Sequence, residues 1–279
     1  MEEEKFTGSG NIKELDLKNV IEYIRTKRGV DLLNSYRSTF VFRRLRIRMR
    51  EVKALNYAEY TDIIEKDPKE FNKFLDVLSI NVTEFFRDKE VFDAFRNIIL
   101  PGIIKNKESN KENIIRVWSA GCASGQEPYS LAIILKEALA DKKDFLIRIT
   151  ATDIDSLALE NADKAEYNIS DFKEIDNKIL EKYFTLAYNG CYKLNDEIKN
   201  MVLFRRNNLI SEPPLHFIDV IFCRNVLIYF KREQQDLIFQ KFNQALNRQG
   251  FLVIGKTEMI WSKDLFAAVN TRQKIYQKL

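Results

Sequence analysis

Apolar residues recur at helical spacing over residues 12–80. The first such group consists of Val20, Ile21 and Ile24. Spacings of three and four residues are typical of helices that bury one face. Asp67-Pro68 indicates a further helix start, because aspartate caps a helix and proline suits its first position. The pattern predicts a small helical domain over 12–80, preceded by a flexible tail at 1–11.

One helix of this domain is unusually basic and is expected from about Arg37 to Val52. A projection at 100° per residue places its apolar positions on one buried stripe. The stripe consists of Val41, Leu45, Met49 and Val52. The arginines fall into two rows, both expected to be exposed. One row consists of Arg37, Arg44 and Arg48, and the other of Arg43, Arg46 and Arg50.

After Pro101-Gly102 the pattern changes to strands that alternate with helices, which predicts parallel β-α-β units. The expected strands are Ile114 to Trp118, Phe145 to Thr152, Phe217 to Cys223 and Phe251 to Gly255. The expected helices are Pro128 to Ala140, Ser156 to Lys164 and about Arg232 to Leu246. The chain is therefore divided into a linker and connecting helix at 81–100 and an α/β domain at 101–279.

Residues 183–204 interrupt this alternation. Asn189-Gly190 lies between two short apolar runs, and this dipeptide favours a two-residue type I′ hairpin. We expect a small antiparallel β subdomain at about 183–204, inserted into the α/β domain.

Composition sets the class of protein. The 279 residues are 45% hydrophobic and 31% charged, which excludes a disordered or collagen-like chain and allows two domains. The three cysteines have no metal-binding spacing, and we expect no metal. The acidic start, MEEEK, does not resemble a signal peptide, and no apolar run approaches the roughly 18 residues that span a bilayer. A cytoplasmic protein without direct membrane insertion is the simplest interpretation.

The net charge of +4 is unevenly distributed. Between Arg25 and Arg50 there are nine Lys or Arg and one acid, Asp31, so that this stretch carries +8 and the remainder −4. Such a stretch is either a solvated helix face or a docking surface for an acidic partner. The scarcity of interspersed acids favours the partner.

The loop after the first strand is the first candidate site. Gly121 and Gly125 allow the backbone to approach a ligand closely, but the G-x-G-x-x-G spacing is absent. Glu127 would sit at the amino end of the next helix, where it repels phosphate and suits a cation or an amino group. The loop therefore favours a cofactor with a nucleoside part, a positive centre and no phosphate.

Asp153 ends the second strand and is the candidate for holding a ribose, since an acid there can accept hydrogen bonds from both hydroxyls. The alternative role is that of a helix cap. Asp155, directly before Ser156, suits the cap better, which leaves Asp153 for the ligand.

Two further polar segments complete the candidate site, Asn81 to Arg87 and Cys223 to Phe230. Polar side chains just past the carboxyl end of a strand face the ligand crevice of an α/β sheet. Arg224, Asn225 and Tyr229 are candidates on this ground, although salt bridges and caps explain any one of them equally well.

Together these segments resemble the CheR family of chemotaxis receptor methyltransferases over about Asp16 to Lys278. The matching motifs are N-x-T-x-F-F-R (Asn81 to Arg87), W-S-A-x-x-x-x-G-x-E-P-Y-S (Trp118 to Ser130), A-T-D-I-D (Ala151 to Asp155) and C-R-N-V-x-I-Y-F (Cys223 to Phe230). Most relatives have Gly-Glu-Glu-Pro where this chain has Gly125-Gln126-Glu127-Pro128.

The resemblance implies a Rossmann-like S-adenosylmethionine-dependent methyltransferase domain with a small antiparallel β subdomain, preceded by an all-helical domain. It implies methyl transfer to glutamate side chains in the cytoplasmic helical region of chemoreceptors, with S-adenosylhomocysteine as product. The implied cofactor contacts are Asn81, Thr83, Arg87, Glu127, Asp153, Asn208, Leu209, Asn225 and Val226, and Gly121 joins this set through the close backbone approach of its loop. The residues implied near the transferred methyl are Arg87, Arg224 and Tyr229.

The chemistry agrees with this assignment, because a glutamate carboxylate, with a reference pKa of about 4.3, is already ionised at neutral pH and needs no general base. One alternative is a nucleic-acid methyltransferase whose arginine helix grips phosphate, but Cys223-Arg-Asn-Val is not the motif expected beside a base amine. The other is a non-catalytic module that senses a nucleotide or S-adenosylmethionine. Retention of Arg87, Arg224 and Tyr229 counts against it.

Overall fold

The computed structural model describes residues 14–28, 31–76, 78, 83–142, 144–187, 190–262 and 264–279. The chain divides into two compact units, Met1–Leu78 and Ser79–Leu279. Each is described by itself.

The first unit is helical, as its sequence predicts. Its helices are α1 (Glu14–Arg28), α2 (Leu32–Ser35), α3 (Ser38–Glu51), α4 (Tyr57–Lys66) and α5 (Pro68–Asp76). The predicted cap is confirmed, since the Asp67 carboxylate accepts the backbone N–H of Lys69 at 2.9 Å in the first turn of α5. Side chains from four of these helices form the core. They include Leu17, Ile24, Leu45, Tyr60, Ile64 and Phe74, all without exposed area.

Helix α3 is the predicted basic helix and ends within one residue of the expected bounds. Val41, Leu45 and Met49 are buried as expected, and Val52 at its carboxyl end is half-buried. Phe40 and Phe42 are buried as well, so the buried surface of the helix is wider than a single stripe.

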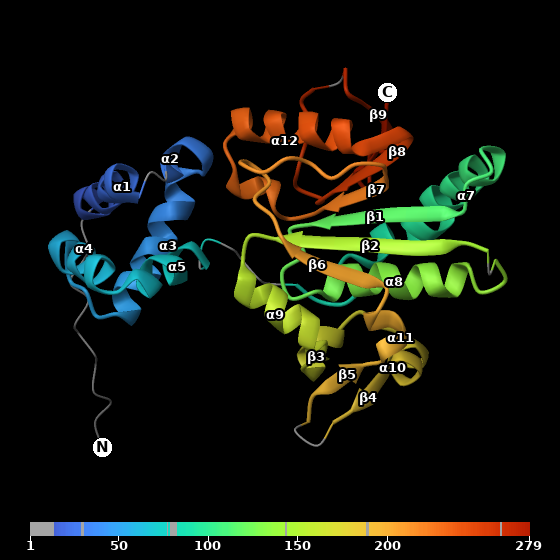
Figure 1. Cartoon of the computed structure of the whole chain (residues 1–279), viewed down its shortest axis with the longest axis horizontal. Helices are drawn as coiled ribbons and strands as arrows, with labels where there is room; N and C mark the ends of the chain where they lie inside the picture. The colour runs from blue at the N-terminus through green and yellow to red at the C-terminus, as the bar shows by residue number, and fades with distance from the viewer. Residues whose placement is uncertain are drawn as a thin grey trace. The chain divides into compact units, whose positions relative to one another are not determined.

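A seven-stranded sheet forms the centre of the second unit (Figure 1). Its strands are β1 (Ile114–Ala120), β2 (Leu146–Asp153), β6 (Val202–Arg206), β7 (Ile218–Cys223), β8 (Leu246–Ile254), β9 (Phe266–Asn270) and β10 (Ile275–Lys278). Their order in the sheet is β6-β2-β1-β7-β8-β10-β9. The first five of these strands are parallel, while β10 runs antiparallel to β8 and β9 antiparallel to β10. The Rossmann-like α/β fold is thus confirmed.

Helices cover both faces of this sheet. Ile115 and Val117 of β1 share a core with Leu131 and Leu135 of α8 (Gln126–Ala138). On the other face the Trp118 ring packs edge-on against Phe242 of α12 (Arg232–Ala245), with 5.3 Å between ring centroids. Helix α9 (Ser156–Lys164) begins and ends where the sequence predicts. Because β1, β2 and β7 are parallel, their carboxyl ends meet at one edge of the sheet, where ligands bind in such folds.

A nearly continuous helix precedes β1. It consists of α6 (Lys89–Ala94), a π-helical turn (Phe95–Ile99) and α7 (Leu100–Ser109). Pro101 lies in the first turn of α7, so the change of pattern at Pro101-Gly102 falls within a helix. Residues 83–100 pack in the core of the second unit through apolar side chains such as Phe85, Phe92 and Phe95.

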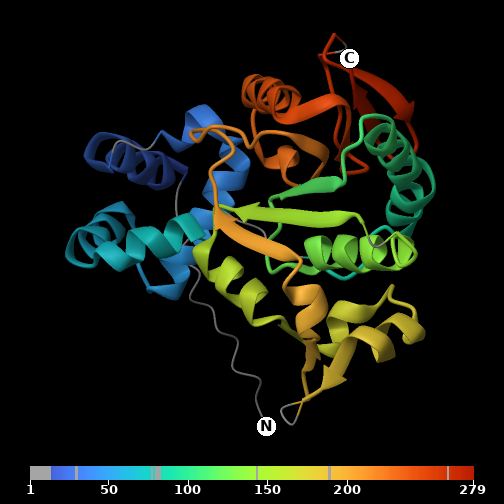
Figure 2. The same ribbon diagram turned by 45° about the vertical axis from the view of Figure 1, so that its right-hand side comes forward.

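A second, three-stranded antiparallel sheet forms a lobe with α10 (Asn177–Tyr183) and α11 (Asp196–Lys199), beside the main sheet (Figure 2). Its strands, in spatial order, are β3 (Glu166–Tyr167), β5 (Tyr192–Leu194) and β4 (Phe184–Leu186). The predicted subdomain therefore exists, but its bounds of 183–204 are wrong. It recruits β3 from earlier in the chain, and residues 202–206 form β6 of the main sheet.

The predicted two-residue turn at Asn189-Gly190 lies partly outside the described residues. Tyr188 and Asn189 lie outside the described residues, yet the pairing on both sides of them is clear. Leu186 pairs with Tyr192, and the Ala187 N–H donates to the Cys191 carbonyl at 2.8 Å. Gly190 takes the left-handed conformation, with φ of 78°.

Within the described residues, no helix is long and apolar enough to cross a membrane.

Candidate functional site: a cofactor pocket at the carboxyl ends of the strands

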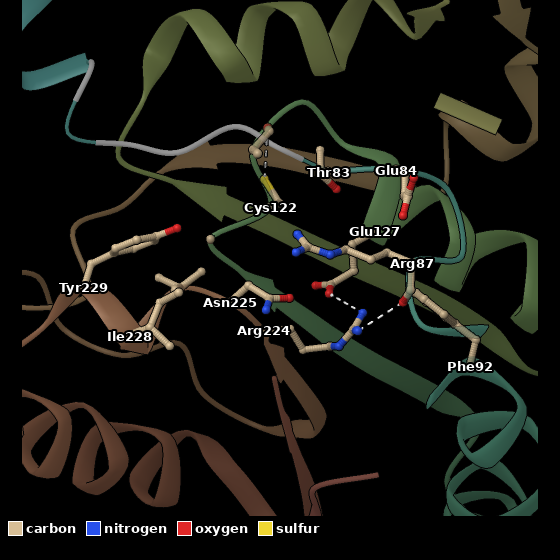
Figure 3. A pocket seen from close by; sticks show the side chains of 13 residues that line it. Thr83, Glu84, Arg87, Phe92, Cys122, Glu127, Arg224, Asn225, Ile228 and Tyr229 are labelled. Atoms are coloured by element: carbon tan, nitrogen blue, oxygen red, sulfur yellow. Dashed lines mark hydrogen bonds and ion pairs between the residues drawn. The ribbon is translucent and has the colours of Figure 1, made fainter. Parts of the chain in front are cut away.

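A cavity of about 110 Å³ lies at the edge of the sheet where β1 and β7 end (Figure 3). Three predicted segments meet there. The lining residues are Thr83, Glu84, Arg87, Phe92, Gly121, Cys122, Ala123, Glu127, Arg224, Asn225, Val226, Ile228 and Tyr229. The volume is below the roughly 300 to 1,000 Å³ of a complete small-molecule site, so this cavity is too small to enclose a drug-sized ligand completely.

The glycine loop forms one wall through a close backbone approach. Gly121 has φ of 81°, and a Cβ atom there would lie 2.4 Å from a methyl of Val226. Gly125, with φ of 93°, precedes α8, and its Cβ would lie 2.9 Å from Ala162. The loop thus needs glycine at both positions, for conformation and for space.

Glu127 lies in the first turn of α8 and faces the cavity. Its Oε1 accepts a hydrogen bond from Ser119 at 2.8 Å, and its Oε2 lies 3.5 Å from the Arg224 guanidinium. Burial raises the pKa of Glu127 above its ordinary value, while Arg224 and Ser119 pull it down. A buried carboxylate in this position favours a positively charged ligand group.

The Arg224 side chain makes more contacts within the protein than predicted. Its side chain is buried under the ring of Phe92, and one terminal nitrogen donates to Asp88 at 2.5 Å and to the Arg87 carbonyl at 3.0 Å. Among the described residues, its Nε atom has no hydrogen-bond partner. Arg224 therefore fixes the segment Arg87-Asp88 beside the cavity.

Asp88 forms ion pairs with two basic side chains beside the cavity, Arg224 and Lys256. Its backbone is left-handed, with φ of 61°, and its carboxylate also contacts Lys256 at 2.9 Å. Partial burial raises the pKa of Asp88, but Lys256 and Arg224 outweigh this effect, so the net pKa is lowered. No motif singled out Asp88 or Lys256, because their roles depend on contacts distant in sequence.

Arg87 and Tyr229 lie on opposite sides of the cavity. In Figure 3 the Arg87 guanidinium and the Tyr229 hydroxyl both point toward its middle. The structure thus brings together the three residues that the sequence assigns to the methyl group, of which Arg224 is the most enclosed.

Asp153, Asn208 and Leu209 form a separate group next to this cavity. The Asp153 carboxylate accepts the N–H of Ala123 at 2.8 Å and that of Asp155 at 3.0 Å. Burial raises its pKa, against the effect of these backbone donors. Its carbonyl accepts the N–H of Asn207 at 2.9 Å, so the residues after β6 lie beside it. The predicted cap is confirmed, since Asp155 accepts the Ala158 N–H at 3.0 Å.

Lys241 holds the loop that contains Asn208 and Leu209. From α12 its ammonium donates to the carbonyls of Leu209, Ile210 and Glu212 at 3.0, 2.5 and 2.7 Å. Asn81, also predicted as a cofactor contact, lies outside the described residues.

Glu258 is a buried residue of the site that the sequence did not indicate. Its Oε1 accepts the N–H groups of Leu227 and Ile228 at 2.8 and 3.3 Å, and its Oε2 that of Gly255 at 2.6 Å. It also accepts the N–H of Asn225, a residue with φ of 61°. Glu258 therefore anchors the loop that presents Asn225, Val226 and Tyr229.

Comparison with known proteins assigns these features to one family. The family model described as "CheR methyltransferase, SAM binding domain" matches residues 81–275, and "CheR methyltransferase, all-alpha domain" matches residues 15–79. The chain belongs to the CheR methyltransferase family. Its SAM-binding domain identifies it as an S-adenosylmethionine-dependent methyltransferase.

Curated CheR relatives are similar over most of their length. A "Chemotaxis protein methyltransferase" from Borreliella burgdorferi is 31% identical over 92% of this chain and 92% of its own. A protein of the same name from Listeria monocytogenes is 31% identical, covering 88% of this chain and 91% of its own. "Chemotaxis protein methyltransferase 2" from Vibrio cholerae is 31% identical, covering 88% and 86%. A nucleic-acid methyltransferase and a non-catalytic sensor are not favoured.

Gln126 does not line the cavity. Its side-chain amide accepts from Ser124 at 3.0 Å and donates to Asp171 at 3.3 Å. Asp171 also binds the segment before α6, since its carbonyl accepts the Phe85 N–H at 2.9 Å. Gln126 thus links the glycine loop to the β3-β5-β4 lobe, and this role needs an amide rather than a second carboxylate.

Phe85 anchors the Thr83–Arg87 segment in that same lobe. Its ring stacks on Phe172 and meets Tyr167 and Phe184 edge-on, with centroids 4.8 to 5.0 Å apart. The Phe86 N–H donates to Ser130 of α8 at 3.0 Å. The lobe therefore helps to position the segment that supplies Thr83 and Arg87 to the cavity.

The arginines of α3 do not all face solvent, and the prediction for Arg48 is wrong. Arg48 is buried, with Nε and one Nη 3.0 and 2.5 Å from the two oxygens of buried Glu70. It also pairs with Glu51, and Tyr60 donates to Glu70 at 3.1 Å. Arg48 is thus part of the core of the first unit.

The remaining α3 arginines are exposed to different degrees. Arg37, Arg43 and Arg50 are exposed, whereas Arg44 and Arg46 are half-buried. The Arg44 guanidinium lies over the ring of Phe40, 5.8 Å from its centroid.

Among the described residues, no group of three or more His, Cys, Asp or Glu side chains is placed to hold a metal ion.

Proposed function

We propose that this CheR protein transfers a methyl group from S-adenosylmethionine to glutamate side chains of chemoreceptors. The products would be glutamate methyl esters and S-adenosylhomocysteine, and the reaction would take place in the cytoplasm, on the receptors' helical region. The observation that carries the proposal is the convergence of Arg87, Arg224 and Tyr229 on a cavity that also contains Glu127.

The charges of the cavity fit the amino-acid end of S-adenosylmethionine. Glu127 suits the ammonium group, and Arg87 lines the same cavity. Gly121 lines the cavity, and a side chain at this position would collide with Val226. We propose that Thr83, Asn225 and Val226 complete this end, and that Asn81, Asp153, Asn208 and Leu209 hold the nucleoside. No metal is required by this arrangement.

S-adenosylmethionine supplies an electrophilic methyl group on a positively charged sulfur. The carboxylate that receives it carries no proton at neutral pH, so the protein does not need a general base. This agrees with His216, the single histidine, which is exposed and does not line the cavity.

What the side chains contribute is orientation and exclusion of water. Holding two reacting groups in near-attack geometry can supply about 7 to 11 kcal/mol. Arg87 and the Tyr229 hydroxyl are suited to orient the incoming carboxylate through charge-assisted hydrogen bonds. Arg224 acts mainly through Arg87-Asp88, which it holds in place.

Receptor recognition is assigned to the exposed and half-buried arginines of α3 and of its N-cap. Chemoreceptor glutamates make an acidic substrate, and a surface of one charge attracts it over a distance set by ionic strength. The surface consists of Arg37, Arg43, Arg44, Arg46 and Arg50, with Arg48 removed from the predicted set.

Radiolabelling tests the proposal. The purified protein is incubated with tritiated S-adenosylmethionine and with receptor-containing membranes, nucleic acid or buffer alone. We expect label in the receptor band only, released as methanol by mild base, as for a carboxyl ester. Base-stable label, or label in nucleic acid, would overturn the proposed reaction.

A further inference from the structure

The backbone on both sides of Arg87 has the left-handed conformation. Phe86 has φ of 54° and Asp88 φ of 61°, and neither residue is a glycine. This conformation is costly for L-residues because Cβ approaches the carbonyl oxygen that follows, and aspartate tolerates it better than a bulky side chain does. Such strain persists only where the surrounding structure holds it. The contacts of Phe86 and Asp88 therefore determine how the backbone presents Arg87.

Phe86 is held by the core of the second unit. Its backbone N–H donates to the Ser130 hydroxyl at 3.0 Å, and that hydroxyl donates to the Gln126 carbonyl at 2.7 Å. The Phe86 ring meets Phe92 of α6 edge-on, with 5.5 Å between ring centroids. Ser130 and Phe92 are both buried, so the chain before Arg87 is fixed by packing and by a buried hydrogen bond.

Asp88 is held by ion pairs instead. Its Oδ2 lies 2.5 Å from a terminal nitrogen of Arg224, and its Oδ1 lies 2.9 Å from the Lys256 ammonium. The same Arg224 nitrogen donates to the Arg87 carbonyl at 3.0 Å (Figure 3). One guanidinium thus binds the Asp88 side chain and the Arg87 backbone, so the position of Asp88 is coupled to that of Arg87.

The two cations that bind Asp88 come from adjacent strands of the sheet. Arg224 directly follows β7, and Lys256 follows β8 by two positions. Lys256 also contacts Glu90, in the first turn of α6, at 3.3 Å. Asp88 therefore ties the segment that contains Arg87 to the carboxyl ends of both strands.

Asp88 is the nearer of two carboxylates that pair with Arg224. The other belongs to Glu127, at 3.5 Å. The Arg224 side chain is only 2% exposed, and a buried charge without a partner is costly. Because Asp88 supplies this partner, Glu127 can bind an ammonium group without leaving Arg224 unpaired.

We propose that Asp88 is a positioning residue for Arg87, supported by Lys256, and that its ion pairs aim the Arg87 guanidinium at the carboxylate that receives the methyl group. This inference rests on the proposed function, in which Arg87 orients that carboxylate. Asp88 and Lys256 do not line the cavity, so they act through Arg87. Orientation of reacting groups changes the rate of the chemical step more than the affinity for the cofactor.

The first test compares methylation kinetics of single variants on a purified cytoplasmic fragment of a chemoreceptor from the same genome. Asparagine tolerates the left-handed backbone but forms no ion pair, so Asp88→Asn should lower kcat about tenfold. The Kd for S-adenosylhomocysteine should stay within twofold of wild type. Lys256→Met should lower kcat about threefold, because this ion pair is partly exposed. The matched control is Glu90→Gln, which removes the other partner of Lys256 and should leave kcat within twofold.

The second test determines whether Asp88 acts through Arg87. Adding Asp88→Asn to Arg87→Ala should lower kcat less than twofold further, because the side chain that Asp88 positions is already absent. A role in stability alone would give the same loss in both backgrounds. Rates are measured by tritium incorporation, which detects slow turnover. If Asp88→Asn does not fold, Lys256→Met provides the same comparison, since its side chain is 44% exposed.

The outcomes separate the two proposals. Methylation of the fragment by the wild-type protein, with Asp88→Asn and Lys256→Met within twofold of it, would overturn the positioning role alone. Equal losses of kcat with and without the Arg87 side chain would overturn it as well. Absence of ester label with the wild-type protein on every receptor fragment would overturn the proposed function and this inference with it.

Discussion

The Glu258 carboxylate accepts a hydrogen bond from the Leu227 N–H at 2.8 Å, although Glu258 lies 31 residues further along the chain. The same carboxylate binds three other N–H groups, and Gln235 of α12 donates to the Leu227 carbonyl at 2.8 Å. The loop that carries Asn225 and Tyr229 is therefore fixed from both sides by residues that do not line the cavity. Its geometry depends on buried polar partners rather than on its own sequence.

Replacing Glu258 with Gln should loosen this loop. The amide has one oxygen where the carboxylate has two, so at least one buried N–H loses its acceptor, at a cost of about 1 to 3 kcal/mol. We expect lower thermal stability and about tenfold weaker binding of S-adenosylhomocysteine, measured by calorimetry. The control is Glu233→Gln, an exposed position on α12. Binding and turnover within twofold of wild type would show that Glu258 does not position the loop.

Some elements could be predicted because the signals that define them are local. Helix α9 matches its expected bounds, since Asp155 caps its first turn, and the site motifs follow strands whose apolar runs are unmistakable. Strands β3 and β6 were missed because one has two residues and the other is a half-exposed edge. Edge strands are defined by their partners, and no periodic pattern marks them.

Side-chain roles that depend on contacts distant in sequence were not predictable. Arg48 has the same spacing as the exposed arginines, and only Glu70, 22 residues away, makes it a core residue. Glu258 and Lys241 belong to no recognised motif, because each binds backbone groups of a distant loop. Such roles depend on tertiary contacts that the one-dimensional pattern does not contain.

Asp153→Asn is expected to weaken S-adenosylhomocysteine binding by at least about 1.5 kcal/mol, slightly more than tenfold, because a charge-assisted hydrogen bond is lost. Its carboxylate also holds Ala123 and Asp155, so a purely structural role must be separated from ribose binding. An analogue without ribose hydroxyls serves this purpose. If Asp153 binds the ribose, the substitution should cost less affinity for the analogue than for the natural product. Equal losses would assign Asp153 to the loop alone.

Arg87→Ala and Tyr229→Phe should lower turnover more than cofactor affinity. Both side chains point into the cavity, and the reaction needs orientation of a carboxylate rather than proton transfer. Single-turnover rates and Kd values for S-adenosylmethionine measured on the same preparations give the comparison. If rate and affinity fall by the same factor, the two residues act in cofactor binding.

The α3 arginines should divide into two functional classes. Arg48→Ala leaves Glu70 as a buried unpaired charge, and breaking such a pair costs about 3 to 5 kcal/mol, which urea unfolding would detect. Arg43→Glu with Arg50→Glu changes exposed positions and should leave stability nearly unchanged. The double variant should instead raise KM for the receptor and reduce the salt dependence of the rate. If the rate of the double variant depends on salt as strongly as that of the wild type, α3 does not take part in receptor docking.

The raised pKa of Glu127 predicts how cofactor binding depends on pH. Burial favours the protonated carboxyl in the folded state, so the folded protein holds this proton more firmly than the unfolded chain does. As pH falls through the raised pKa toward 4.5, protonation relieves the cost of the buried charge, and this group's contribution to folding stability improves.

Binding of the ammonium group requires the ionised carboxylate of Glu127, so cofactor affinity should fall over the same pH range. Affinity and turnover should be flat between about pH 6.5 and 8, where a histidine base would titrate. Calorimetry from neutral to acidic pH should show the loss for the wild-type protein and a smaller one for Glu127→Gln, which binds weakly throughout. Asp153 also has a raised pKa. The pH profile of cofactor affinity for Asp153→Asn shows how much of the loss at low pH comes from Asp153. An affinity that is constant down to the pH at which the protein unfolds would mean that Glu127 does not hold the ammonium group.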